Sequence, residues 1–404
     1  MKILLVNDIG RATGGAELQM LSLRTRLRDR GHDVRLLSSR ANSIADSKLL
    51  ADYSCFGSNT KLQVLNQTFN PDAYWQLRKI LAEFQPEVVH LRIFLGQISP
   101  LILPLLENIP CIYQMAMYRP ICPKGTKILP SGSPCQYRAG IACLNQHCLT
   151  PQSWAVLMLQ KQLWQTWRNN IDCLVALSHG MKLQLEAEGV APVEVVYNGV
   201  RERPMRSALS NPPVVAFAGR LVDTKGVDVL IEAFSIARTE VSQARLIIAG
   251  RGENEASLRE LAIALGVDDA ITWLGHVPRA ELEQQFDRSW VQVIPSLWAE
   301  PFGNVTTEAM MRGTAVIASR VGAQPEIVVD GKTGFLVEPG DESGLAEKLI
   351  TLLSSQQLAT EMGQQGRNRA LSVFSEDKRD LTFLEIYTRL QAEYQAKSQI
   401  AQQL

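Results

Sequence analysis

Short aliphatic runs alternate with helical segments along the chain, and this alternation limits the fold more than any other feature of the sequence. In the first half the runs predict strands at Lys2–Val6, Val34–Ser38, Val88–His90, Cys111–Met115, Leu174–Leu177 and Glu194–Tyr197. Helices are predicted between them, notably at Glu17–Arg30 and Tyr74–Phe84. Such alternation favours right-handed βαβ units, which form a parallel sheet covered by helices on both faces.

The second half repeats the pattern. Strands are predicted at Val214–Ala218, Arg245–Ala249, Ile271–Leu274, Val291–Ile294, Ala315–Ala318 and Gly334–Val337. Helices are predicted at Val227–Thr239, Asn254–Leu265, Arg279–Asp287, Val305–Arg312 and Ser343–Ser354. A second parallel α/β domain is therefore expected.

A polar stretch rich in proline and glycine separates the two halves, and a chain of 404 residues is long enough for two hydrophobic cores. We predict an α/β protein with two facing Rossmann-like domains and an interdomain cleft. The first domain covers residues 1–200, the linker 201–213 and the second domain 214–375. Residues 376–404 are predicted to be helical and to pack back on the first domain. Ligands of such sheets bind beyond the carboxyl ends of the strands.

The charge balance excludes one class of partner. Lys and Arg together number 41, as do Asp and Glu, so the formal net charge is zero and a nucleic-acid binder is not indicated. The apolar run at Lys2–Val6 suits a buried strand rather than a signal peptide, and no apolar segment is long enough to span a bilayer. We expect a cytoplasmic protein.

Peripheral contact with the inner face of the plasma membrane is a further expectation. It depends on a basic helix and an aromatic one: Arg24, Arg26, Arg28 and Arg30 in the first, and Trp154, Trp164 and Trp167 within Ser153–Arg168 in the second. The favoured alternative is a tryptophan-rich helix packed on the first domain, with an arginine face in water.

The cysteines do not indicate a disulfide framework. There are seven, an odd number in a large chain, and four lie between Cys122 and Cys148 without a Cys-x-x-Cys pair. Reduced structural thiols are favoured over a zinc site.

Three loops of the second half carry charge or glycine where ligands bind. The first, Gly219–Gly226, offers Arg220 and Lys225, which suit the charge of a diphosphate leaving group. The second contains Gly250, where a small residue permits close approach to the backbone. Taken singly, the two cations are as readily explained as surface residues, and the glycine motif is weak.

The third loop, Pro295–Glu308, is the strongest of the three. Its amides at Gly303, Asn304 and Val305 open a helix and suit phosphate, and its carboxylates suit sugar hydroxyls at Glu300 and ribose hydroxyls at Glu308. Glu308 alone could instead offset the helix dipole. In the first half, Gly14 and Gly15 lie between the first strand and the first helix, a position that also suits a plain connecting loop.

Together these stretches resemble the retaining GT-B glycosyltransferases of family four, which include bacterial capsule and cell-envelope enzymes. The resemblance rests on Gly14-Gly-Ala-Glu17, Gly219-Arg-Leu, Lys225-Gly226, Glu300-Pro-Phe-Gly303, Glu308, Gly322-Ala-Gln-Pro-Glu326 and Gly331-x-x-Gly334, in the family's order. It implies transfer of a sugar from a UDP- or GDP-sugar to a saccharide or lipid-linked acceptor, in cell-surface polysaccharide or glycoconjugate synthesis, without a cofactor or metal.

The resemblance also implies roles for individual residues. Arg220 and Lys225 would contact the diphosphate, Glu300 the sugar and Glu308 the ribose. His276 and Val277 would contact the base, and Gly15 would lie near the reacting centre. The leaving phosphate would accept the acceptor's proton, so no protein base is expected.

The first half departs from the family pattern. His90-Leu-Arg92 replaces a His-x-His motif, and Ala116-Met117 replaces His-Asp. His90 remains a candidate for positioning the sugar, although a histidine packed in the sheet is the safer interpretation, and Arg92 could indicate an acidic acceptor. Arg138 stands where relatives carry the second cysteine of a close pair. Two alternative functions stay open: a nucleotide-sugar epimerase of the same fold, and a nucleotide-sugar-binding protein with impaired turnover.

Overall fold

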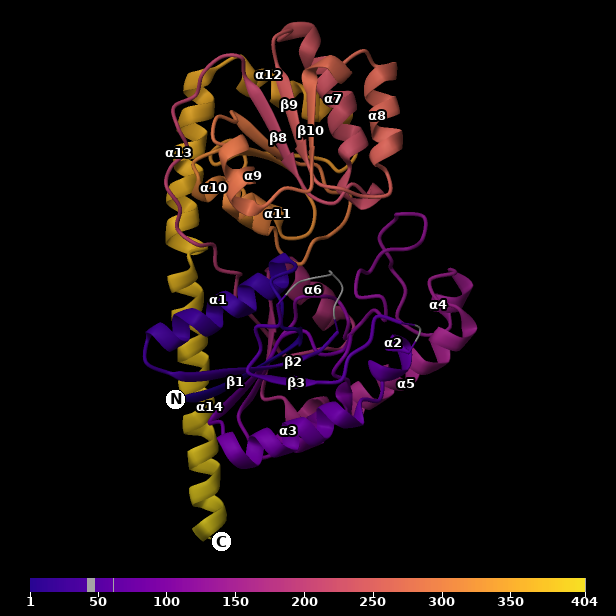
Figure 1. The fold of residues 1–404 in the computed structure, drawn as a ribbon, viewed down its shortest axis with the longest axis vertical. Coiled ribbons are helices and arrows are strands. Elements are labelled where there is room, and N and C mark those ends of the chain that lie inside the picture. The colour runs from indigo at the N-terminus through magenta and orange to yellow at the C-terminus, as the bar shows by residue number, and fades with distance from the viewer. Residues whose placement is uncertain (42–47, 61, 404) are drawn as a thin grey trace. The chain divides into compact units, whose positions relative to one another are not determined.

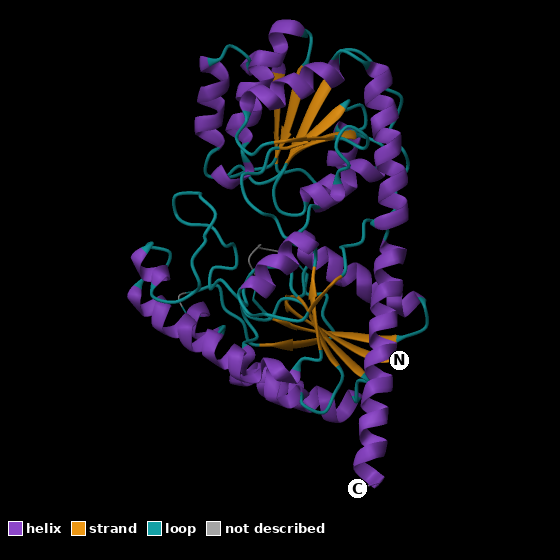
Figure 2. Cartoon of the chain, turned by 180° about the vertical axis from the view of Figure 1, so that it is seen from behind, coloured by secondary structure: helices purple, strands orange, loops and turns teal. Residues whose placement is uncertain are grey.

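The computed structural model describes residues 1–41, 48–60 and 62–403, and it divides into two compact units. Unit 1 contains residues 1–131, 135–199 and 379–404, and unit 2 contains residues 132–134 and 200–378. Each unit is a parallel α/β structure, as the alternating pattern predicts (Figure 1). Helices lie on both sides of the strands in each unit (Figure 2).

Unit 1 is built on seven parallel strands within the described residues, in the order β3-β2-β1-β4-β5-β6-β7. They are β1 (Lys2–Ile9), β2 (Asp33–Ser39), β3 (Tyr53–Cys55), β4 (Val88–Leu91), β5 (Cys111–Gln114), β6 (Cys173–Ala176) and β7 (Val193–Val195). Its helices are α1 (Gly15–Asp29), α2 (Gln63–Asn66), α3 (Pro71–Phe84), α4 (Ala142–Asn145), α5 (Pro151–Trp167) and α6 (His179–Ala187), with 3-10 turns at Pro100–Leu106 and Arg168–Asn170.

Two of these helices begin with the same local signal. Asn70 caps α3 by accepting a hydrogen bond from the amide of Ala73 at 3.0 Å, and Thr150 caps α5 by accepting one from Ser153 at 3.3 Å. Proline follows each cap as the first helical residue, where its missing N–H has no intrahelical acceptor to lose.

The last helix, α14 (Glu376–Gln403), completes the core of unit 1. Its apolar side chains pack with those of β1, β2 and α1, and the buried members of α14 are Phe383, Ile386, Tyr387 and Leu390. Asp380, whose side chain is fully buried, accepts a hydrogen bond from Arg26 of α1 at 2.6 Å. Residues from the two ends of the sequence therefore share one core.

Unit 2 is built on six parallel strands within the described residues, in the order β10-β9-β8-β11-β12-β13. They are β8 (Val214–Ala218), β9 (Arg245–Ala249), β10 (Ile271–Gly275), β11 (Val291–Ile294), β12 (Ala315–Ser319) and β13 (Phe335–Val337). Its helices are α7 (Val227–Glu240), α8 (Glu255–Ala264), α9 (Arg279–Gln285), α10 (Asn304–Met311), α11 (Gln324–Ile327), α12 (Glu342–Leu353) and α13 (Gln356–Val373), with 3-10 turns at Asp223–Lys225 and Asp268–Ala270.

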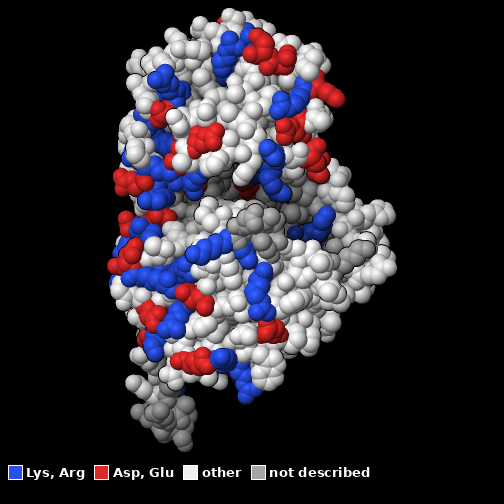
Figure 3. All heavy atoms as spheres, in the orientation of Figure 1, with Lys and Arg blue, Asp and Glu red and all other residues white. Residues whose placement is uncertain are grey.

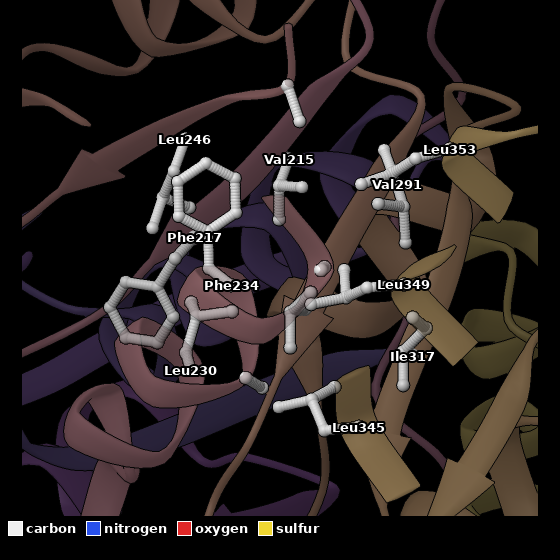
Figure 4. Packing of buried hydrophobic residues seen from close by; sticks show 14 of the residues in the cluster. Val215, Phe217, Leu230, Phe234, Leu246, Val291, Ile317, Leu345, Leu349 and Leu353 are labelled. Atoms are coloured by element: carbon white, nitrogen blue, oxygen red, sulfur yellow. The ribbon is translucent and has the colours of Figure 1, made fainter. Parts of the chain in front are cut away.

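The core of unit 2 lies between its strands and the paired helices α7 and α12 (Figure 4). Val215 and Val291 of the strands and Leu349 of α12 are fully buried within it. Burial of each such side chain contributes roughly 1.5–3 kcal/mol relative to exposure. This packing holds the strand ends, and the loops that follow them, in fixed register.

The basic helix and the tryptophan-rich helix that were expected at a membrane make contacts within unit 1. Arg24 and Arg28 form ion pairs with Asp52 at 3.1 and 2.9 Å, and Trp164 is only 1% exposed. The burial of Trp164 favours the alternative of a tryptophan-rich helix packed on the first domain, whereas Arg24 and Arg28 pair with Asp52 instead of facing water alone. No helix in the described part of the chain combines the length and apolar character needed to cross a bilayer. Basic and acidic side chains are interspersed over the face seen in Figure 3.

Candidate active site

The strand order of unit 2 places a topological switch point between β8 and β11. The chain runs from β8 outward to β9 and β10, then returns to β11 on the other side of β8 and continues to β12 and β13. The loops after β8 and β11 therefore leave the sheet side by side and diverge. Ligands of open parallel sheets bind at this position.

An ion pair joins the two loops at the switch point. Lys225, after β8, donates to the Oε1 atom of Glu300, after β11, at 2.6 Å. The hydroxyl of Ser296 donates to the same oxygen at 2.6 Å. The side chains of Lys225 and Glu300 are 19% and 17% exposed, so solvent reaches the pair but screens it less than a surface pair. Ser296 had no assigned role, although it lies in the same predicted loop.

The backbone also ties these loops together. The amide of Leu297 donates to the carbonyl of Thr224 at 3.0 Å. Gly226 has a φ of +61°, and a Cβ there would overlap the carbonyl oxygen of Pro295. Glycine at 226 thus allows the close approach that brings Lys225 to Glu300.

Arg220 and Gly250 lie at the same edge of the sheet but differ in what they contact. Arg220 is exposed, and its side chain forms no hydrogen bond or ion pair with any described residue. Gly250 has a φ of +146°, and a Cβ there would overlap the carbonyl oxygen of Gly219. The structure therefore accounts for Gly250 by the packing of two neighbouring loops, rather than by room for a ligand.

The helix after Glu300 begins where the sequence predicts. Gly303 precedes α10 and has no side chain to cap it, and Asn304 and Val305 form its first turn. Thr306 donates to the side-chain oxygen of Gln324 at 2.8 Å, which fixes this turn against α11. The opening of α10 is thus held at the same strand edge as Lys225 and Glu300.

Glu308 lies one turn further along α10 and is held by a residue that sequence reasoning missed. Arg279 donates to its Oε1 atom at 2.5 Å. Arg279 begins α9, directly after the loop that carries His276, which is exposed, and Val277, which is half-buried. The proximity of Arg279 to His276-Val277 in the sequence was the one available signal. Unit 2 therefore holds every predicted donor-binding residue except Gly15.

The two predicted site residues of unit 1 have different surroundings. Gly15 is exposed and is the first residue of α1, directly after β1. His90 is fully buried: its ring packs against Phe383, and its Nδ1 shares a hydrogen bond of 2.6 Å with the hydroxyl of Tyr387. A side chain enclosed by α14 has no surface to offer a sugar, so the expected role of His90 is corrected to a structural one.

Burial of His90 predicts a pH dependence of stability. Burial lowers the pKa of His90 from 6.5 to about 3, so the unfolded chain binds its proton more readily than the folded one. The free energy of unfolding is therefore not reduced by His90 above pH 6.5, and it decreases as the pH falls from 6.5 toward 3. We expect His90 to lower the free energy of unfolding by about 2 kcal/mol between pH 6.5 and about 5.

Chemical denaturation at both pH values, on the wild type and His90→Asn, checks this prediction. The variant replaces the titrating ring with a neutral amide, so its pH dependence should be shallower by that amount. Equal pH dependence in the two proteins would contradict it.

Two buried ionisable side chains lie near strand ends of unit 1. Arg92 donates to the side-chain oxygens of Gln114 and Asn198 and is 2% exposed. Its guanidinium is therefore not accessible to an acidic acceptor. Asp8, a residue without a predicted role, accepts hydrogen bonds from three successive backbone amides, at residues 96–98, at 2.7–2.9 Å. Burial nevertheless raises the pKa of Asp8 to about 6.

The cysteines between Cys122 and Cys148 are all partly exposed and unpaired as disulfides. Mutual repulsion contributes to a raised pKa of Cys148, after the larger effect of burial. Within the described residues, no group of three or more His, Cys, Asp or Glu side chains is arranged to hold a metal ion.

Two family models match the chain, and they meet near the start of unit 2. A model described as "Glycosyltransferase Family 4" matches residues 13–203, and one described as "Glycosyl transferases group 1" matches residues 200–369. Together they include every predicted site residue.

Curated relatives and solved structures agree with these matches. The D-inositol 3-phosphate glycosyltransferase of Corynebacterium efficiens is 38% identical over 157 residues, which are 37% of each chain. The phosphatidyl-myo-inositol mannosyltransferase of Mycobacterium leprae is 28% identical over 361 residues, which are 85% of each. The structure of Anabaena HepE in complex with UDP-glucose aligns with a TM-score of 0.68 at 20% identity, covering 96% of this chain and 100% of that one. At that identity the likeness shows a shared fold.

Proposed function

Because the chain belongs to the GT-B glycosyltransferases of the family-four type, we propose that it transfers a sugar from a UDP- or GDP-sugar to a saccharide or lipid-linked acceptor with retention of configuration. The observation that carries this proposal is the contact between Lys225 and Glu300 at the switch point of unit 2. A cation and an acceptor of hydroxyl hydrogen bonds lie together there, which supports a site for a donor whose diphosphate adjoins its sugar.

The ion pair is compatible with a donor site that has no ligand bound. Before binding, each charge neutralises the other. When the donor enters, its diphosphate accepts hydrogen bonds from Lys225, and its sugar hydroxyls donate to Glu300. Arg220, exposed and without a protein partner among the described residues, supplies a second cation, and α10 begins in the loop after β11, where its first amides suit a phosphate.

In the proposed step, the bond between the anomeric carbon and the diphosphate oxygen breaks, and the acceptor oxygen bonds to that carbon on the same face. The acceptor's proton passes to the leaving phosphate, so no protein base is needed. Lys225 and Arg220 offset the charge that develops on the diphosphate. Since these cations serve that purpose, activity should be unchanged by EDTA.

A panel of nucleoside diphosphates and nucleotide sugars, read by thermal shift, tests donor binding, because a ligand of the folded state raises its melting temperature. Release of nucleoside diphosphate then tests turnover. Slow release without acceptor supports the transferase. Binding of the donor with no release under any acceptor would instead indicate a binding protein, and binding of no nucleotide would sink the proposal.

The proposed lipid-linked acceptor is supported by one relative and by exposed apolar side chains of unit 1. The Mycobacterium leprae relative is named for a phosphatidylinositol substrate, which supports a lipid-linked acceptor here. Unit 1 exposes large apolar side chains at Leu62, Leu65 and Phe69, each at least 57% exposed, which supports peripheral contact with a cytoplasmic membrane surface. Flotation with anionic liposomes checks that contact, and protein that stays at the bottom at low salt would end it.

A further inference from the structure

A row of alternating charges leads away from Glu308 in unit 2. Arg279 of α9 donates to Oε1 of Glu308 at 2.5 Å, and its Nε donates to Glu283 of the same helix at 3.3 Å. Glu283 in turn accepts a hydrogen bond from Arg203, which lies in the segment before β8. Arg279 is therefore held from two sides, by one carboxylate on its own helix and by one on α10.

A small, partly open pocket lies beside this row, lined in part by Arg279, Glu283 and Glu308. Its inner wall includes Arg312, which is 9% exposed, donates to Gln292 at 2.8 Å and lies over the ring of Phe286. The charges of the row thus face a partly enclosed space in which water screens them less than at an open surface.

Only one oxygen of Glu308 is occupied. Arg279 holds Oε1, and no donor among the described residues reaches Oε2. A glutamate side chain on a helix surface otherwise samples several rotamers, which a ligand must restrict when it binds. The ion pair restricts them in advance.

We propose that Arg279 is a positioning residue for the donor's ribose: by holding Oε1 of Glu308, it presents Oε2 to the ribose hydroxyls. This inference rests on the proposed function, which assigns Glu308 to the ribose. Glu283 is the anchor of Arg279, and it keeps the guanidinium on the side of α9 that faces α10. The row of Arg279, Glu283 and Arg203 therefore contributes to binding of the ribose, whereas the loops after β8 and β11 bind the diphosphate.

The chain contains a matched control. Arg259 of α8 pairs with Glu255, four residues away on the same helix, at 3.0 Å, and its side chain is 45% exposed compared with 41% for Arg279. No described carboxylate on another helix pairs with Arg259. Arg259→Ala therefore removes a similar helical ion pair without touching Glu308.

The experiment measures binding of a nucleoside diphosphate and of its analogue lacking both ribose hydroxyls, by calorimetry, on the wild type, Arg279→Ala and Arg259→Ala. The base is the one that raises the wild-type melting temperature most. We expect the wild type to prefer the ribose form about tenfold, as for loss of a charge-assisted hydrogen bond. Arg279→Ala should lose most of that preference by weakening the ribose form alone, Arg279→Lys should restore part of it, and Arg259→Ala should keep it.

The outcomes separate this inference from the proposed function. If Arg279→Ala weakens both ligands equally, or keeps the preference for ribose, Arg279 has only a structural role and the inference is wrong. If the wild type binds neither ligand, the proposed function itself fails. A preference that falls in Arg279→Ala and also, to a smaller degree, in Glu283→Gln supports the whole row.

Discussion

Replacing Lys225 or Glu300 by alanine should lower turnover about 10²- to 10³-fold, because in the proposed reaction Lys225 offsets the charge that develops on the diphosphate and Glu300 orients the sugar. Stability should change little. Solvent reaches the mostly buried pair, so losing one partner should cost about 1–2 kcal/mol, which is less than a core truncation. Steady-state release of nucleoside diphosphate gives the turnover, and chemical denaturation gives the free energy of unfolding.

Lys348→Ala is a suitable control for this prediction. Lys348 of α12 pairs with the adjacent Glu347 at 2.7 Å, and its side chain is 30% exposed, but it lies outside the loops after β8 and β11. Turnover should stay at the wild-type value in this variant. The placement of the site is wrong if Lys225→Ala or Glu300→Ala unfolds as readily as a core truncation while keeping its specific activity.

Gly250→Ala should destabilise unit 2 by about 3 kcal/mol or more, because its Cβ would overlap a backbone carbonyl that cannot rotate away. The residue joins two neighbouring loops: the amide of Gly219 donates to Ala249, and that of Gly250 donates to Gly275. Moving either loop to relieve the overlap breaks these bonds. Chemical denaturation, with hydrogen exchange of β8 and β9, measures the loss.

Gly266→Ala separates the overlap from backbone strain. Gly266 also has a positive φ, of +66°, but a Cβ there meets nothing within 4 Å. Its replacement should cost about 1–2 kcal/mol, the strain of a left-handed residue alone. If the two variants are equally stable, the explanation of Gly250 by loop packing is incorrect.

The strands of unit 2 were the most predictable part of the fold. Val214–Ala218, Arg245–Ala249 and Val291–Ile294 are strands with the predicted bounds, because largely buried parallel strands have mainly aliphatic sequences. The short edge strand Tyr53–Cys55 was missed, since three residues carry no period. The helix Gln356–Val373 was also missed, because its mainly polar sequence has a weak apolar face.

The site was predictable where charge lies next to a strand end, and less so where tertiary packing decides. Lys225 and Glu300 are far apart in sequence, yet each follows a predicted strand, so their loops could be expected at one edge. Nothing local to the sequence pairs Arg279 with Glu308, because that contact depends on how α9 and α10 pack. Likewise, His90 looks like a strand-end ligand until α14, nearly 300 residues later, covers it.

The return of α14 to the first sheet has a consequence for biosynthesis. Because Phe383 and Tyr387 complete a core begun by Ile3 and Leu5, unit 1 lacks part of its interior until the ribosome has translated α14. Residues 200–378 have no such dependence on later sequence. The sheet of unit 2 is thus able to fold before that of unit 1, and a stop codon shortly before α14 would damage the core of unit 1 more than that of unit 2.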